Sequence, residues 1–129
     1  MFLDPKAVHT TAAPAAIGPY SQAMTSAGLA FVSGQLGIDP ASGIIPEDFA
    51  TQTRQALANL KTIIEAAGSG LDRVVSVDVF LLDMGNFGAF NEIYTEFFKD
   101  HRPARVVIAV SALPHEAQVE IRCVAALKA

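Results

Sequence analysis

Two charged side chains near the carboxyl-terminal end of the sequence could bind and hydrolyse a small acid. Arg105 opens an apolar run, VVIAV, soon after the rigid Pro103. A guanidinium held at a strand end suits bidentate binding of a carboxylate or phosphate, although surface arginines are also common there. Glu120 lies between Val119 and Ile121, so strand alternation turns it away from their face. It could orient or deprotonate a water molecule in a closed cleft, or it could be a solvated surface carboxylate.

Three uncharged polar residues could line the same cleft. Tyr20 follows a Gly-Pro turn, Ser33 ends a predicted strand, and Asn91 lies among apolar residues of a predicted helix. Each has a purely structural alternative: a packed ring for Tyr20, a turn residue for Ser33 and a solvated helix surface for Asn91. The lone cysteine, Cys123, is expected to be a small buried side chain without a reactive role.

Other common catalytic machineries leave no pattern in the sequence. His9, His101 and His115 are scattered, without HxxxH or HxH spacing, so no metal site is expected and each is predicted to be a solvated loop residue. The SGQLG segment lacks both the GK[ST] ending of a phosphate-binding loop and the spacing of a dinucleotide-binding motif. No G-x-S-x-G elbow occurs, so a covalent serine or cysteine mechanism has no visible basis.

Whether Arg105 and Glu120 can meet depends on how the last strands pair. In a simple hairpin across residues 111–117, Arg105 would face Cys123, and Glu120 would lie three residues along the ladder. Three residues of strand span about 10 Å, which is long for one small substrate. A shared site therefore needs a different strand order or a second subunit.

The hydrophobic pattern predicts one α+β domain over residues 1–129, with two helices on one face of a sheet. The other face of the sheet then needs cover, which association of subunits could supply. Apolar residues at helical spacing predict the helices, and β-branched or apolar runs predict the strands. The first predicted helix has apolar residues at helical spacing from Phe49 to Ala67, with Pro46, Glu47 and Asp48 suited to its first turn and Gly68 to its carboxyl-terminal cap. The second predicted helix covers residues 86–99, and the predicted strands cover residues 21–27, 29–34, 74–82, 105–110 and 119–127.

Composition favours a globular protein that associates with copies of itself. Of the 129 residues, 51% are hydrophobic and 17% are charged, and the mean hydropathy is +0.36. This balance excludes a disordered chain and predicts apolar surface buried in a symmetric homo-oligomer. The net charge is −4 and no run of Lys and Arg occurs, so nucleic-acid binding is not expected.

The sequence shows no pattern that would direct it to a membrane or out of the cell. Residues 7–38 carry no full charge, but prolines, glycines and polar side chains interrupt them and leave no membrane span. The first ten residues lack a basic stretch followed by an apolar one, so no signal peptide is expected. One cysteine can form no internal disulfide. A cytoplasmic location is predicted.

Four stretches of the sequence form a recognisable set: APAAIGPYSQA, SGQLGIDPASG, FNEIYTEFF and RPARVVIAVSALPHEAQVEI. Together they resemble the Rid/YjgF family of reactive-intermediate imine deaminases and, within it, the RidA group. The similarity runs from about Thr11 to Ala126. The last stretch is the most specific, because its P-A-R start, apolar strand, L-P turn and V-E-I ending occur together in register.

The resemblance implies a chorismate-mutase-like fold with a mainly antiparallel sheet, assembled as a homotrimer with clefts between subunits. It implies that Arg105 binds the carboxylate of a 2-imino acid, that Glu120 positions the attacking water, and that Tyr20, Ser33 and Asn91 line the cleft. The implied reaction is hydrolysis of 2-iminopropanoate and 2-iminobutanoate, with their enamine tautomers, to 2-keto acids and ammonia. The resemblance implies no cofactor.

Two other functions stay open at this point. The same arginine-lined cleft could bind 2-keto acids without catalysis, or the protein could be an endoribonuclease, an activity also attached to this family. The acidic composition counts against the second. Two positions depart from the family pattern: Val107 stands where many bacterial members have cysteine, and Gly37 replaces a frequent proline, which predicts a looser cleft lip.

Overall fold

A computed structural model describes residues 4–129; residues 1–3, part of the segment in which no signal peptide is expected, lie outside this range. The strands are β1 (Lys6–Val8), β2 (Ala23–Ser26), β3 (Leu29–Gln35), β4 (Val74–Leu81), β5 (Ala104–Ala109) and β6 (Val119–Ala126). The helices are α1 (Phe49–Ala66) and α2 (Phe87–Phe98), with short 3-10 helices η1 (Leu71–Arg73), η2 (Met84–Asn86) and η3 (Pro114–Glu116).

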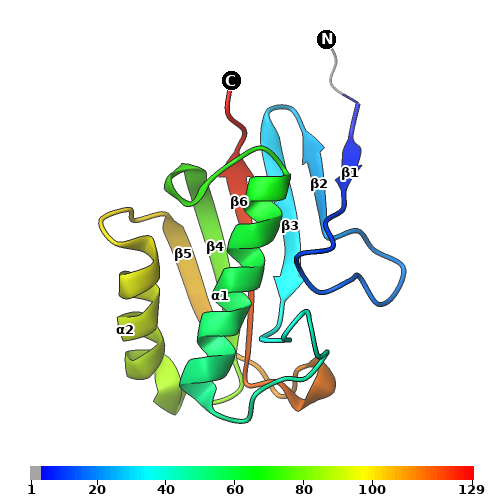
Figure 1. Ribbon diagram of the computed structural model, residues 1–129. Helices are drawn as coiled ribbons and strands as arrows, with labels where there is room; N and C mark the ends of the chain where they lie inside the picture. Colours follow the sequence, from blue (N-terminus) through cyan, green and yellow to red (C-terminus); the bar gives the residue numbers. More distant parts are fainter. Residues whose placement is uncertain (1–3) are drawn as a thin grey trace.

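Within the described residues, six strands form one sheet in the order β1-β2-β3-β6-β4-β5. Figure 1 shows α1 and α2 side by side on one face of this sheet, with α2 nearest to β5. The pairs are antiparallel except for β4 and β5, which run parallel. The predicted α+β layer with a mainly antiparallel sheet is therefore confirmed. The three-residue strand β1 was not predicted.

Helix α1 begins at Phe49, just after the residues expected in its first turn, and ends at Ala66, one residue before the last apolar residue of the predicted helix. The Asp48 side chain accepts a 2.9 Å hydrogen bond from the Thr51 backbone N–H, which satisfies one free donor of the first turn. After the last turn Gly68 adopts a φ of +92°, which glycine tolerates and which ends the helix. The buried apolar residues of α1 are Ala56, Leu57, Leu60, Ile63 and Ile64. No helix in residues 4–129 has the length and apolar character needed to cross a membrane.

The core lies between these helices and alternate residues of the central strands. On β4 the buried side chains are Val74, Val77, Val79 and Leu81, and on β6 they include Val119, Ile121 and Cys123. Cys123 is buried as predicted, and burial raises the pKa of its thiol to about 12. The thiol therefore stays protonated at neutral pH, which leaves it a poor nucleophile.

The last two strands do not form a hairpin, because β4 lies between β5 and β6. Val77 on β4 pairs with Arg105 on one side and with Cys123 on the other. Arg105 and Cys123 therefore lie in the same row across the sheet, as in the hairpin considered from the sequence. They are two strand spacings apart, however, which is about 10 Å. The strand order differs from the simple hairpin and separates Arg105 further from β6.

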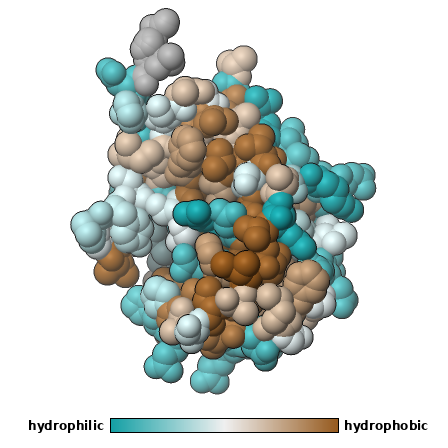
Figure 2. All heavy atoms as spheres, turned by 180° about the vertical axis from the view of Figure 1, so that it is seen from behind, coloured by the Kyte–Doolittle hydropathy of each residue, from teal (hydrophilic) through white to brown (hydrophobic). Residues whose placement is uncertain are grey.

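The sheet face opposite the helices is open and largely apolar in one protomer. Its exposed apolar side chains include Met24, Phe31, Val106 and Ile108, with Phe31 46% exposed. Figure 2 shows this face, where apolar areas lie above and below a polar band near the middle. The face matches the expectation that this chain carries apolar surface available for association.

A divided candidate active site

A hollow of about 770 Å³ opens on the open side of the sheet. It is larger than a three- or four-carbon acid needs, and its walls come from segments far apart in the sequence. Tyr20, Ser33 and Glu120 all line it, so the structure brings three of the predicted site residues together. The other lining side chains include Pro14, Ile17, Gln22, Leu36, Ile38, Asp78, Pro114, His115 and Arg122.

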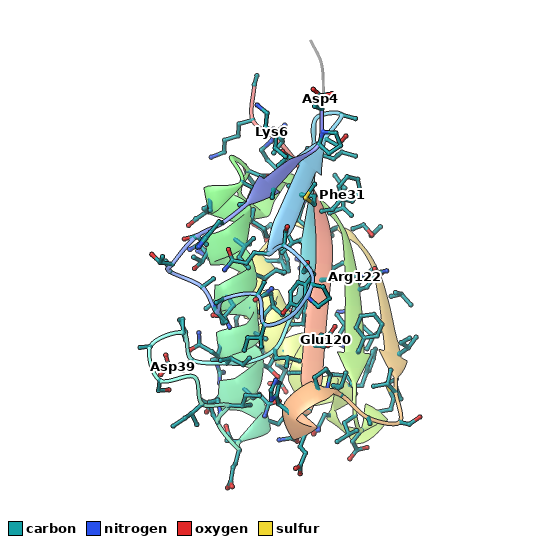
Figure 3. All side chains as sticks on the ribbon, turned by 90° about the vertical axis from the view of Figure 1, so that its right-hand side faces the viewer. Asp4, Lys6, Phe31, Asp39, Glu120 and Arg122 are labelled. Atoms are coloured by element: carbon teal, nitrogen blue, oxygen red, sulfur yellow. The ribbon has the colours of Figure 1, made fainter. Side chains whose placement is uncertain are left out.

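Glu120 lies half-buried in this hollow, on the face of β6 opposite the core (Figure 3). Its carboxylate rests against the backbone of Gly34: a Cβ added at Gly34 would lie 2.1 Å from Glu120 Oε2. Burial raises the pKa of Glu120, and the nearby Arg122 guanidinium offsets part of that rise. The hollow therefore holds a carboxylate whose proton affinity is increased, as suits a group that accepts a proton from water.

Sequence reasoning missed the role of Gly34, which it considered only as part of a failed nucleotide-binding motif. The structure shows that any side chain at this position would displace Glu120. The contact joins β3 to β6, whose residues are close only after folding. No local pattern reveals it; only the glycine inside a predicted strand end marks the position as unusual.

An ion pair beside Glu120 was also missed. Arg122 and Asp78 are direct cross-strand partners, and Arg122 Nε donates a 2.8 Å hydrogen bond to Asp78 Oδ2. Both side chains line the hollow. Alternation along the V-E-I-R segment places Arg122 on the same strand face as Glu120, so the sequence alone could have predicted that these two side chains are neighbours.

Tyr20 and Ser33 both line the hollow, and hydrogen bonds to backbone carbonyls hold each of them there. The backbone N–H of Tyr20 donates a 2.9 Å hydrogen bond to the Gly18 carbonyl, which confirms the predicted turn. The Tyr20 side chain is 52% exposed, so it is not a packed core aromatic. Ser33 Oγ donates a 2.6 Å hydrogen bond to the Ser21 carbonyl. Ser33 belongs to β3 and is not a turn residue. Its hydroxyl oxygen still has lone pairs that can accept a hydrogen bond from a ligand.

Arg105 and Asn91 lie elsewhere, in what we call the Arg105 cluster: Arg105, Phe87, Asn91 and Tyr94. Arg105 is exposed, and its Nη1 donates a 2.9 Å hydrogen bond to Asn91 Oδ1. Its Cζ lies 4.7 Å from the centre of the Tyr94 ring and 5.9 Å from that of Phe87. All three partners are on α2, so Asn91 does more than cover the helix surface. The cluster presents a positive, donor-rich group suited to a carboxylate.

The predicted site residues thus form two groups on opposite faces of one sheet. Arg105 pairs with the core residue Val77 and reaches toward α2, whereas Glu120 pairs with Phe80 and faces the hollow. Among residues 4–129, the lining of the hollow does not include Arg105. One group can bind an anion and the other can hold water and accept a proton.

Two further expectations concern histidine and glycine. His101 is half-buried, and its Nε2 lies 2.7 Å from the Val74 carbonyl oxygen, so it is not the solvated loop residue that was predicted. Gly37 is buried against α1, where a Cβ would lie 2.2 Å from the Gln52 carbonyl oxygen. Tight packing at Gly37 does not support the predicted loosening of the cleft lip. Residues 4–129 contain no cluster of three or more His, Cys, Asp or Glu suited to a metal ion.

Comparisons with known proteins agree over nearly the whole chain. The family model described as Endoribonuclease L-PSP matches residues 10–127. A RutC family protein of Pyrococcus horikoshii is 46% identical over 119 residues, which are 92% of this chain and 94% of that protein. The 2-iminobutanoate/2-iminopropanoate deaminase of Mus musculus is 46% identical over 121 residues, which are 93% of this chain and 90% of that protein.

Solved structures show the same fold. The crystal structure of E. coli TdcF with bound serine has a TM-score of 0.92 and 36% identity, covering 95% of this chain and 99% of that one. The Rid-family protein YyfA of Yersinia pestis has a TM-score of 0.94 and 39% identity, covering 96% of this chain and all of that one. The chain therefore belongs to the Endoribonuclease L-PSP family, which is the YjgF/Rid family.

Proposed function

We propose that this protein hydrolyses small 2-imino acids, such as 2-iminopropanoate and 2-iminobutanoate, to 2-keto acids and ammonia. The observation that carries the proposal is the half-buried Glu120 carboxylate in a hollow shared with Tyr20 and Ser33. Such a carboxylate can hold a water molecule and take its proton. The 46% identity to the mouse 2-iminobutanoate/2-iminopropanoate deaminase supports the same reaction. The predicted cytoplasmic location is part of this proposal.

The proposed active unit is a homotrimer in which one copy's Arg105 cluster faces the hollow of the next copy. Two observations support this arrangement: Arg105 and Glu120 lie on opposite faces of one protomer, and the open face carries exposed Phe31, Val106 and Ile108. A closed ring of identical contacts would bury that face, and at each contact it would bring the Arg105 cluster of one copy beside the hollow of the next. Asn91 would then hold Arg105 at the carboxylate of the substrate.

The proposed mechanism needs only modest catalysis, because a protonated imine is already electrophilic. Arg105 binds the substrate carboxylate, and Glu120 orients one water molecule toward the C2 carbon and accepts its proton. The water oxygen bonds to C2 while the C=N π electrons move to nitrogen. Glu120 then returns the proton to the amine nitrogen. The hydroxyl oxygen forms the 2-keto C=O bond as the C–N bond breaks, its proton passes to the Glu120 carboxylate, and ammonia leaves; ammonia then takes that proton and restores the ionised Glu120.

The ligand class also has support among relatives. TdcF was solved with serine, a small molecule that carries a carboxylate next to a nitrogen-bearing carbon. A 2-imino acid has the same carboxylate and nitrogen on neighbouring carbons. The Arg105 guanidinium, brought beside the polar groups of the hollow, fits ligands of this kind.

A dehydratase-coupled assay with semicarbazide tests the proposal. Semicarbazide traps the free imine released from serine or threonine by a pyridoxal-phosphate dehydratase, so faster hydrolysis lowers the semicarbazone yield and raises 2-keto acid. The proposal expects this change with the wild type and its loss with Arg105→Ala. Binding of 2-oxobutanoate without acceleration would instead indicate a non-catalytic binding protein, and RNA cleavage surviving Arg105→Ala would indicate an endoribonuclease.

A further inference from the structure

The partners of Arg105 form a stripe along one side of α2. Phe87, Asn91 and Tyr94 follow one another at spacings of four and three residues, so their side chains project from the same side of the helix. The Arg105 side chain extends from β5 onto this stripe. The ring of Tyr94 is the nearer of the two aromatic faces, at 4.7 Å against 5.9 Å for Phe87.

Tyr94 is a rigid element of this stripe. It is only 7% exposed, whereas Phe87 is 40% exposed. Its ring packs against Phe90 and Phe98, with centroids 5.6 Å and 4.7 Å away. Its hydroxyl has no hydrogen-bond partner within the described part of the chain, and burial raises its pKa to about 12. The ring is therefore neutral at physiological pH and is fixed by aromatic packing.

We infer that Tyr94 is a positioning residue for substrate binding, whose ring face holds the Arg105 guanidinium ready for a carboxylate. This inference rests on the proposed function of Arg105. A guanidinium is attracted to the negative face of an aromatic ring. Together with the hydrogen bond to Asn91, the ring limits the motion of a long, exposed side chain before substrate arrives. The remaining N–H groups of Arg105 are left for the substrate.

The test compares two substitutions of Tyr94. Tyr94→Leu removes the ring face, and we expect the KM for 2-iminobutanoate and the Kd for 2-oxobutanoate to rise about 2- to 30-fold with little change in kcat. Tyr94→Phe keeps the ring and loses only a hydroxyl that makes no hydrogen bond within residues 4–129, so it is expected to restore most of the lost affinity. A Tyr94→Phe variant as weak as Tyr94→Leu would overturn the inference.

Phe98→Leu is the matched control for lost packing. Phe98 is also buried on α2 and touches the Tyr94 ring, but its ring does not lie over Arg105 in the described structure. We expect Phe98→Leu to lower thermal stability and to raise the Kd for 2-oxobutanoate much less than Tyr94→Leu does, because the Tyr94 ring itself is still present beside Arg105. In an Arg105→Ala background, Tyr94→Leu should produce no further rise in Kd. The inference would be overturned if Tyr94→Leu and Phe98→Leu raised the Kd equally. It would also be overturned if Tyr94→Leu raised the Kd further in the Arg105→Ala background.

The Arg105 side chain gives a second measurement that does not depend on catalysis. In NMR spectra of the wild type, the Arg105 Nε–H resonance, assigned by its loss in Arg105→Ala, should carry a ring-current shift that Tyr94→Leu reduces and Tyr94→Phe retains; the more distant Phe87 ring accounts for what is left. If this Tyr94-dependent shift is observed but the wild type does not hydrolyse imines, the proposed reaction is overturned and the positioning role of Tyr94 is supported. An active wild type whose Arg105 resonance and Kd are unchanged by Tyr94→Leu would overturn the positioning role alone.

Discussion

Arg105 and Glu120 lie on opposite faces of the same sheet, with strand β4 between the strands that carry them. Arg105 is paired with the buried Val77 and reaches α2, whereas Glu120 lines the open hollow. In the proposed homotrimer, a single substrate that contacts both groups would lie between two copies of the chain. This relationship underlies the proposal of a site shared between neighbouring subunits.

Removing the Arg105 guanidinium should weaken substrate binding. A charge-assisted bidentate contact contributes about 1.5–3 kcal/mol, so Arg105→Ala should lower kcat/KM about 10- to 150-fold. Arg105→Lys keeps the charge but loses the planar fork, so its activity should lie between those of the wild type and Arg105→Ala. The control is Arg54→Ala, which removes an exposed cation paired at 3.6 Å with Glu96 on the helix layer. Equal losses for Arg54 and Arg105 would contradict a specific role.

A methyl group at position 34 should disable Glu120 without unfolding the protein. The added Cβ of Gly34→Ala would lie 2.1 Å from Glu120 Oε2, so the carboxylate must move, and misplacing a catalytic group by about 1 Å can lower the rate about 100-fold. We expect kcat to fall while thermal stability changes less. Gly88→Ala is the control, because open space surrounds Gly88 on α2 and alanine favours a helix. Full activity of Gly34→Ala would show that the Glu120 position is unimportant.

The pH dependence of kcat/KM should reflect the raised pKa of Glu120. Burial raises this pKa, and the proposed base must be ionised, so activity should fall with decreasing pH around a value above the usual 4.5 of a glutamate. The Arg122 charge lowers the same pKa. Arg122→Gln should therefore raise the pKa of Glu120 and move the acid limb, the fall of kcat/KM on the low-pH side of the profile, to still higher pH. Arg54→Gln should leave the limb where it is. An acid limb that Arg122→Gln does not move, or moves to lower pH, would contradict this account.

A charge on the open sheet face should prevent assembly and abolish activity together. Ile108 is exposed on that face in one protomer, and Ile108→Asp would bury an unpaired carboxylate in the proposed interface. Light scattering after size exclusion should show the wild type at three times the 13.6 kDa chain mass and Ile108→Asp as a monomer. Ile44→Asp, on an exposed loop, should still assemble. A wild type that is active as a monomer would refute the shared site.

Local patterns predicted most of the elements. The apolar spacing of α1 and the end signals at Asp48 and Gly68 define the helix in sequence and in structure. Strand β1 escaped prediction because it has three residues and two of them are exposed, which leaves no alternation to detect. Strand order was not predictable in the same way, because the insertion of β4 between β5 and β6 depends on contacts between segments distant in sequence.

The sequence predicted which residues belong to the candidate site but not how they are arranged in space. Residue types indicated Arg105 and Glu120, and strand alternation gave the outward direction of Glu120. The contact of Gly34 with Glu120 and the place of Tyr94 beside Arg105 arise from segments that meet only in three dimensions. The side of the sheet that each group occupies follows from register with β4, which the sequence does not state.

Mixing two variants with impaired activity tests the shared site most directly. Arg105→Ala and Glu120→Gln are denatured together in equal amounts, refolded and assayed, with each variant carried alone through the same procedure. In randomly mixed trimers, about a quarter of the sites should combine an intact Arg105 with an intact Glu120 from neighbouring copies, and about a quarter of wild-type activity should return. Hybrid trimers whose activity stays at the level of the separate variants would contradict the account.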